Sequence, residues 1–246
     1  MHWVYLSPHL DDVAFSCGGL LWEQVQRGEK VAVWTLCAGD PPPGPLSAFA
    51  RSLHERWGIG KEAVRKRRSE DVRACRRMGA ARRHFPIPDC IYRKSLQGGE
   101  GLYTSEEELF GEIHPQEAGL VQGVSQMLAR RLPDGARVVC PLGLGGHVDH
   151  RLTRAAAEAV GRALWYYADY PYVQRESVQL EEKTAGMNEE ILRLSEAGLE
   201  AWIEAAAAYA SQMSSFWEDT VTLRGSLRGY SGQIGGARLW RRQSTP

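Results

Sequence analysis

Residues 3–36 decide the fold, and they contain in succession Trp3-Val-Tyr-Leu6, Ser7-Pro-His-Leu-Asp-Asp12, Gly18-Gly-Leu-Leu21 and Val31-Ala-Val-Trp-Thr-Leu36. The first and last of these runs are apolar and rich in β-branched and aromatic residues, as buried strands are. Between them, a helical pattern opens at the paired glycines and stops at Gly28. This strand–helix–strand unit predicts a parallel sheet with a right-handed crossover.

The alternation of strands and helices continues as far as residue 170. It predicts helices over 61–78, 116–131 and 151–162, and strands over 83–88, 137–140 and 164–168. Residues 41–60 are rich in proline, glycine and serine, so a long loop is expected there. The predicted fold class is α/β: a Rossmann-like open, mostly parallel sheet with helices on both faces.

The rest of the chain is expected to be a C-terminal helical extension of a single 246-residue domain, with the core at 1–172 and the extension at 173–246. The pattern predicts a short strand at 178–180, a helix over 187–213 and an irregular segment from 217 onward. The alanine-rich stretch 203–210 is interpreted as a packing surface or an interface of a homo-oligomer.

The composition excludes several classes of protein. The 30 basic and 30 acidic residues leave no net charge to attract nucleic acid or an anionic membrane. No run approaches the roughly 20 apolar residues of a membrane span, and the first residues lack a signal-peptide pattern. Five cysteines without a CxxC pair favour reduced thiols and a cytoplasmic location.

The first candidate for chemistry directly follows the first predicted strand. His9, Asp11 and Asp12 lie within four residues, at the end of the sheet where α/β proteins bind their ligands. Adjacent aspartates repel each other, and a divalent metal ion removes that repulsion. Histidine and aspartate together are typical zinc ligands.

The second candidate is Gly145-Gly-His-Val-Asp-His150, which follows the predicted strand 137–140. We expect one histidine to bind the metal and the other to face the substrate, with Asp149 orienting a ring nitrogen. Either motif alone would also fit a helix N-cap or a polar loop. Together they supply a three-ligand set, a spare acid and a spare histidine.

This order of motifs resembles the PIG-L/LmbE family of zinc-dependent N-deacetylases. Similar elements follow along the chain, namely Arg67-Arg-Ser-Glu70, Ile87-Pro-Asp89, Trp165-Tyr-Tyr-Ala-Asp-Tyr-Pro-Tyr172 and Tyr209-Ala-Ser-Gln212. Many members have Ala-His-Pro-Asp-Asp-Glu where this chain has Pro8-His-Leu-Asp-Asp-Val13. The ligands and the base are kept, whereas the shape of the pocket is expected to differ.

The resemblance implies a Zn²⁺ ion held by His9, Asp12 and His150. A zinc site of this kind lowers the pKa of a bound water from ~16 toward ~7. Asp11 would be the general base on that water.

The other implied roles concern the oxyanion and the substrate. His147, oriented by Asp149, would stabilise the tetrahedral oxyanion as an imidazolium. Arg67, Asp89 and Arg93 would bind the substrate. That substrate would be a small N-acylated, sugar-like molecule related to N-acetylglucosamine, and the reaction would remove its acetyl group.

Three other interpretations remain. The first is a zinc amidase that cleaves larger amide conjugates. The second is a nucleotide-binding module without catalysis, which would require Gly-x-Gly-x-x-Gly after the first strand, where this chain has His-Leu-Asp-Asp. The third is a metal-binding protein that has lost catalysis.

Overall fold

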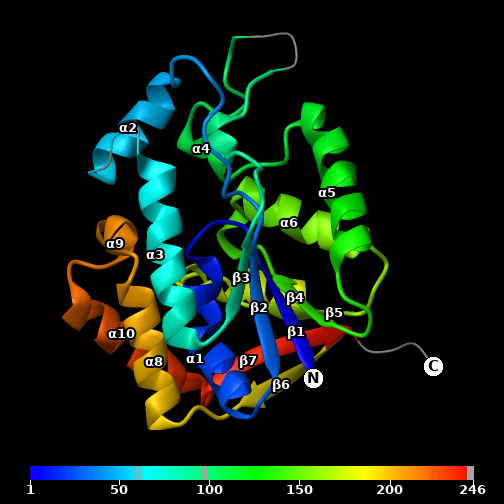
Figure 1. The fold of residues 1–246 in the computed structure, drawn as a ribbon, viewed down its shortest axis with the longest axis vertical. Helices are drawn as coiled ribbons and strands as arrows, with labels where there is room; N and C mark the ends of the chain where they lie inside the picture. Colours follow the sequence, from blue (N-terminus) through cyan, green and yellow to red (C-terminus); the bar gives the residue numbers. More distant parts are fainter. Residues whose placement is uncertain (59, 61, 96–98, 243–246) are drawn as a thin grey trace.

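A seven-stranded sheet forms the centre of the fold (Figure 1). The computed structural model describes residues 1–58, 60, 62–95 and 99–242. The strand order is β3-β2-β1-β4-β5-β7-β6. Strands β1 to β5 are parallel, and β7 runs antiparallel to both of its neighbours, β5 and β6. The strands are β1 (His2–Ser7), β2 (Lys30–Thr35), β3 (Ala81–His84), β4 (Arg137–Pro141), β5 (Leu164–Tyr167), β6 (Met187–Leu192) and β7 (Ala237–Arg242).

Helices cover both faces of the sheet, as the sequence predicts (Figure 1). One layer holds α1 (Asp12–Gln26), α3 (Ala63–Met78), α8 (Glu196–Ala207) and α10 (Thr220–Ile234), and the other holds α5 (Ala118–Arg131) and α6 (Val148–Glu158). The central strands are almost wholly buried between these layers.

The approach of α8 to α1 depends on a glycine. A Cβ atom at Gly18 would lie 2.7 Å from Cδ1 of Trp202, which is too close for real carbon contacts. The Trp202 indole also donates a hydrogen bond to the Phe15 carbonyl at 2.9 Å. Ile203, Ala205 and Ala206 of the alanine-rich stretch are buried, so this part of α8 packs within the chain.

Several short helices connect the longer elements. They are α2 (Ala48–Arg56), η1 (Cys90–Tyr92), α4 (Glu106–Leu109), η2 (Pro115–Glu117), η3 (Leu144–Gly146), η4 (Tyr172–Gln174) and α9 (Ala210–Phe216). Among them, α2 and α4 lie beyond the upper ends of the central strands in Figure 1. The expectation of an unbroken loop over 41–60 is wrong, because α2 begins after Ser47, whose Oγ accepts the Ala50 N–H at 3.0 Å. Lys61, the expected start of the next helix, lies outside the described residues.

The C-terminal extension differs most from the prediction. The expected strand at 178–180 is part of a helix, α7 (Ser177–Thr184), and the expected helix over 187–213 is β6, α8 and α9 in succession. The segment expected to be irregular contains α10 and β7. β7 pairs with β5 on one side and β6 on the other, so this segment owes its structure to contacts with distant residues.

All five cysteines are buried and unpaired. No described helix is both long and apolar enough to cross a bilayer.

Candidate metal and active site

A cavity of about 450 Å³ opens where the carboxyl ends of β1 and β4 meet. Its wall includes His9, Asp11 and Asp12 from the first motif, and His147 and His150 from the second. The two motifs, separated by more than a hundred residues in the sequence, therefore share one site because β1 and β4 are parallel neighbours.

Local hydrogen bonds fix the first motif at the start of α1. Asp12 accepts the His9 N–H at 2.7 Å, and the Ser7 hydroxyl donates to the His9 carbonyl at 2.6 Å. The same hydroxyl oxygen accepts the Val13 N–H at 3.3 Å. This turn places Asp12 in the first helical turn with its carboxylate toward the histidine.

The Asp12 carboxylate lies between two imidazole rings. One oxygen is 3.3 Å from His9 Nδ1, and the other is 3.3 Å from His150 Nε2. Two ligand atoms on a tetrahedral zinc with bonds of about 2.0–2.1 Å are about 3.3 Å apart. The residue types suit zinc, and each histidine lies at the distance of a neighbouring zinc ligand from Asp12, with a different carboxylate oxygen facing each ring.

His147 belongs to the same cluster. Ring nitrogens of His9, His147 and His150 lie within 4.8 Å of one another, so His147 is close enough to act on anything bound to the other two. His147 Nδ1 accepts the Asp149 N–H at 3.2 Å. This bond favours the neutral ring with its proton on Nε2.

Each predicted histidine ligand contacts a buried carboxylate through its other nitrogen. His9 Nε2 is 3.0 Å from Asp149 Oδ2, and His150 Nδ1 is 2.6 Å from Asp169 Oδ1. Asp169 is itself held by the Leu144 N–H at 2.9 Å. Such carboxylates fix the tautomer and direction of a metal-binding imidazole.

The sequence assigned no role to Asp169, although it lies two residues beyond the end of β5 and is 1% exposed. The role expected for Asp149 needs correction. The Asp149 carboxylate contacts His9, the Arg93 guanidinium at 2.6 Å and the Cys90 N–H at 3.0 Å. Its contact with His147 is made by the backbone N–H alone. His147 caps α6, which directs the Asp149 side chain toward η1.

Asp11 differs from Asp12 in its partners. Its carboxylate accepts from the Arg67 guanidinium at 3.2 Å and makes no contact with an imidazole. Burial raises the pKa of Asp11, the Arg67 charge opposes this shift, and the neighbouring Asp12 charge adds to it. Burial also acts on Asp12, but His150 and His9 outweigh it and hold the Asp12 pKa well below its usual range.

Burial lowers the pKa of His147 well below its usual value, and the nearby His9 and His150 lower it further. The structure thus favours a neutral His147 rather than the expected imidazolium.

Known proteins with similar sequences are deacetylases. The family profile described as "PIG-L: GlcNAc-PI de-N-acetylase" matches residues 4–160. The chain belongs to the PIG-L family. The 2'-N-acetylparomamine deacetylase of Streptomyces fradiae is 35% identical over 188 residues, which cover 72% of this chain and 60% of that protein. The enzyme of the same name from Niallia circulans is 28% identical over 199 residues, covering 73% and 70% respectively.

Solved structures of PIG-L relatives share the whole fold. The zinc-inhibited form of teicoplanin deacetylase matches with a TM-score of 0.81 and 25% identity, over 100% of both chains. The deacetylase of the A40926 pseudoaglycone matches with a TM-score of 0.74 and 28% identity, over 100% of this chain and 99% of the other. These matches confirm the predicted fold class and family.

The three residues expected at the substrate of this PIG-L chain separate into two groups. Arg67 and Asp89 line the cavity, and Arg67 Nη1 is 3.8 Å from Asp89 Oδ2. Arg93 does not line it, because its guanidinium is buried against Asp149 and Glu117. Arg93 therefore stabilises the buried Asp149 carboxylate behind the cavity wall, contrary to the expectation that it binds the substrate.

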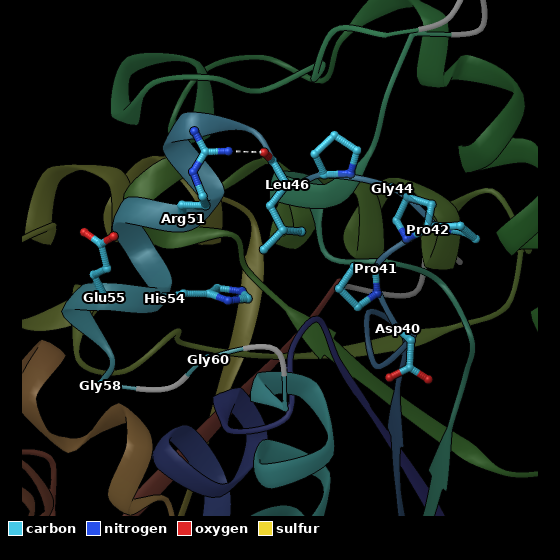
Figure 2. A pocket seen from close by; sticks show the side chains of 12 residues that line it. Asp40, Pro41, Pro42, Gly44, Leu46, Arg51, His54, Glu55, Gly58 and Gly60 are labelled. Atoms are coloured by element: carbon cyan, nitrogen blue, oxygen red, sulfur yellow. Dashed lines mark hydrogen bonds between the residues drawn. The ribbon is translucent and has the colours of Figure 1, made fainter.

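A larger cavity of about 920 Å³ lies on the other side of α2 (Figure 2). Prolines 41, 42, 43 and 45 and Leu46 form much of its wall. His54 also lines it, but its Nε2 is 2.6 Å from the Tyr92 hydroxyl and it has no second histidine beside it. The chemistry of this PIG-L chain therefore belongs to the smaller cavity.

Proposed function

We propose that this protein is a zinc-dependent hydrolase that removes the N-acetyl group from an amino sugar. The observation that carries the proposal is the Asp12 carboxylate between His9 and His150, with Asp11 in the same cavity. The relatives named as deacetylases of acetylated paromamine and of teicoplanin support the same reaction on a sugar-like amine.

His9, Asp12 and His150 would hold the zinc ion, which lowers the pKa of a coordinated water and polarises the amide carbonyl. Asp11 accepts the proton of the attacking water at its carboxylate, since it is the acid of the pair that no imidazole engages. Its raised pKa makes it a better proton acceptor. His147 donates from Nε2 to the oxygen that becomes negative as the tetrahedral intermediate forms. Asp11 then returns its proton to the leaving amine.

The five unpaired cysteines support a cytoplasmic location, because oxidising compartments favour disulfides. The pairing of β7 with β5 supports treating residues 1–246 as one domain, because the extension completes the sheet of the core.

The experiment is the release of acetate from a panel of N-acetylated amino sugars by protein of measured zinc content. Acetate released in proportion to zinc-loaded protein supports the proposal. Release of a bulkier acid from larger amide conjugates, with N-acetyl sugars untouched, would favour the amidase interpretation instead.

A further inference from the structure

The outer part of the catalytic cavity has aromatic walls. Phe110, Tyr172 and Phe216 line it on one side, and Trp57 contributes another ring; these four residues are called the aromatic wall below. Phe110 and Tyr172 have ring centroids 6.4 Å apart, and Tyr172 and Phe216 are 6.2 Å apart. The aromatic wall begins beside the catalytic residues, since the ring centroids of Phe110 and His147 are 5.6 Å apart.

Two members of the aromatic wall face solvent. Phe110 is 40% exposed and Phe216 is 36% exposed. In the part of the chain that the structure describes, they are the only exposed phenylalanines, and both line this one cavity. Exposed aromatic surface is unfavourable in water, and its concentration at a cavity mouth is typical of a binding site.

The charged side chains that line the cavity nearly balance, because three arginines lie among four carboxylates. Arg67 is paired with Asp11 and Asp89, and Arg56 is paired with Glu106 at 2.9 Å. Arg175 also lines the cavity, and its guanidinium has no ion pair or hydrogen bond among the described residues. A divalent zinc ion would make the formal sum of these charges positive, which disfavours a cationic ligand.

Resting on the function proposed above, we propose that the aromatic wall binds an uncharged aromatic aglycone linked to the N-acetylated sugar. The acetyl group has only a methyl group beyond the carbonyl carbon that is attacked. It therefore stays beside the buried catalytic groups and does not reach the aromatic wall. The sugar ring separates the reacting amide from the aglycone, which therefore reaches the exposed rings of Phe110 and Phe216. A cavity of about 450 Å³ is large enough for a ligand of that size.

The test compares kcat/KM for three N-acetylglucosaminides that differ only in the aglycone: propyl, aminopropyl and 2-naphthyl. We expect the 2-naphthyl compound to be preferred over the propyl compound by about tenfold, and the aminopropyl compound to be the poorest at low salt. Phe216→Ala and Phe110→Ala should each reduce the ratio of kcat/KM for the naphthyl over the propyl compound to about threefold or less. Phe216→Tyr keeps the ring and should keep the preference, and Val221→Ala, a change at an exposed residue of α10, should alter nothing.

A naphthyl preference that is absent, or that survives both alanine variants, would overturn the proposal. A second result would also overturn it: the enzyme prefers the N-octanoyl to the N-acetyl form of the propyl glycoside, and Phe216→Ala abolishes this preference. The aromatic wall would then bind the acyl group and not the aglycone. Calorimetric binding of 2-naphthyl glucosaminide separates this proposal from the proposed function. Binding that is weakened in Phe216→Ala, without acetate release from any glycoside, would support the aglycone site and contradict the deacetylase.

Discussion

Asp169 Oδ1 lies 2.6 Å from Nδ1 of His150, on the opposite side of the ring from the Nε2 that faces Asp12. A neutral imidazole carries one proton, so this carboxylate holds the proton on Nδ1 and leaves Nε2 free to bind zinc. The orientation of one predicted ligand thus depends on a residue from the end of a different strand.

Asp169→Asn should weaken zinc binding by about 10- to 100-fold, because the amide can no longer hold the Nδ1 proton as strongly. The measurement is zinc affinity in competition with a chromophoric chelator. Asp134→Asn, a change of a fully exposed carboxylate, is the control. Equal zinc affinity in the two variants would remove Asp169 from this role.

Asp11→Asn should retain zinc and lose about 10²- to 10⁴-fold in kcat, since the amide cannot accept the proton of water. Zinc content and acetate release are measured on the same preparation. If the variant keeps zinc and full kcat, Asp11 is not the base. Loss of zinc would instead place Asp11 among the ligands.

Arg93→Ala should lower the free energy of unfolding by about 3–5 kcal/mol, because it leaves the buried Asp149 carboxylate without its cation. Urea unfolding measures the effect. Arg162→Ala removes a partly exposed cation and should change stability by less than about 1 kcal/mol. Similar losses in the two variants would contradict the supporting role of Arg93.

Gly18→Ala should destabilise the protein by about 1–3 kcal/mol, because the added methyl group meets the Trp202 ring between α1 and α8. Gly123→Ala is a matched change within α5, where a Cβ has nothing within 4 Å. It should stabilise the protein by about 0.5–1 kcal/mol. Thermal unfolding of both variants should show a lower melting temperature for Gly18→Ala and a higher one for Gly123→Ala.

The core of the fold was predictable because its strands are buried on both faces and therefore appear as continuous apolar runs. The extension was not predictable in this way. Three glycines, 225, 229 and 232, lie within α10 and weaken its helical pattern. β7 is rich in arginine, and Arg238 and Arg241 lie over Trp240 and Trp165, contacts that only the folded chain provides.

The site shows the same division. Clustered acids and histidines after two strands could be recognised in the sequence. The structure brings five of those side chains to the wall of one cavity and buries the sixth, Asp149, behind it. Asp169 lies in the segment 165–172 that resembles the family, but its partner His150 comes from a different strand end, so no role could be assigned to it from the sequence alone. Phe110 and Phe216 were missed because they lie at the C-terminal ends of α4 and α9, elements that only tertiary contacts bring to the same wall.

The most direct test of the central claim is a zinc titration of metal-free protein, followed by acetate release from an N-acetylglucosaminide. The site predicts negligible activity without metal and a rise to a plateau at one zinc per chain. In Asp12→Ala the plateau should be lost, because the ligand between His9 and His150 is gone. Full activity in chelated protein that contains no metal, or an unchanged titration in Asp12→Ala, would contradict the account.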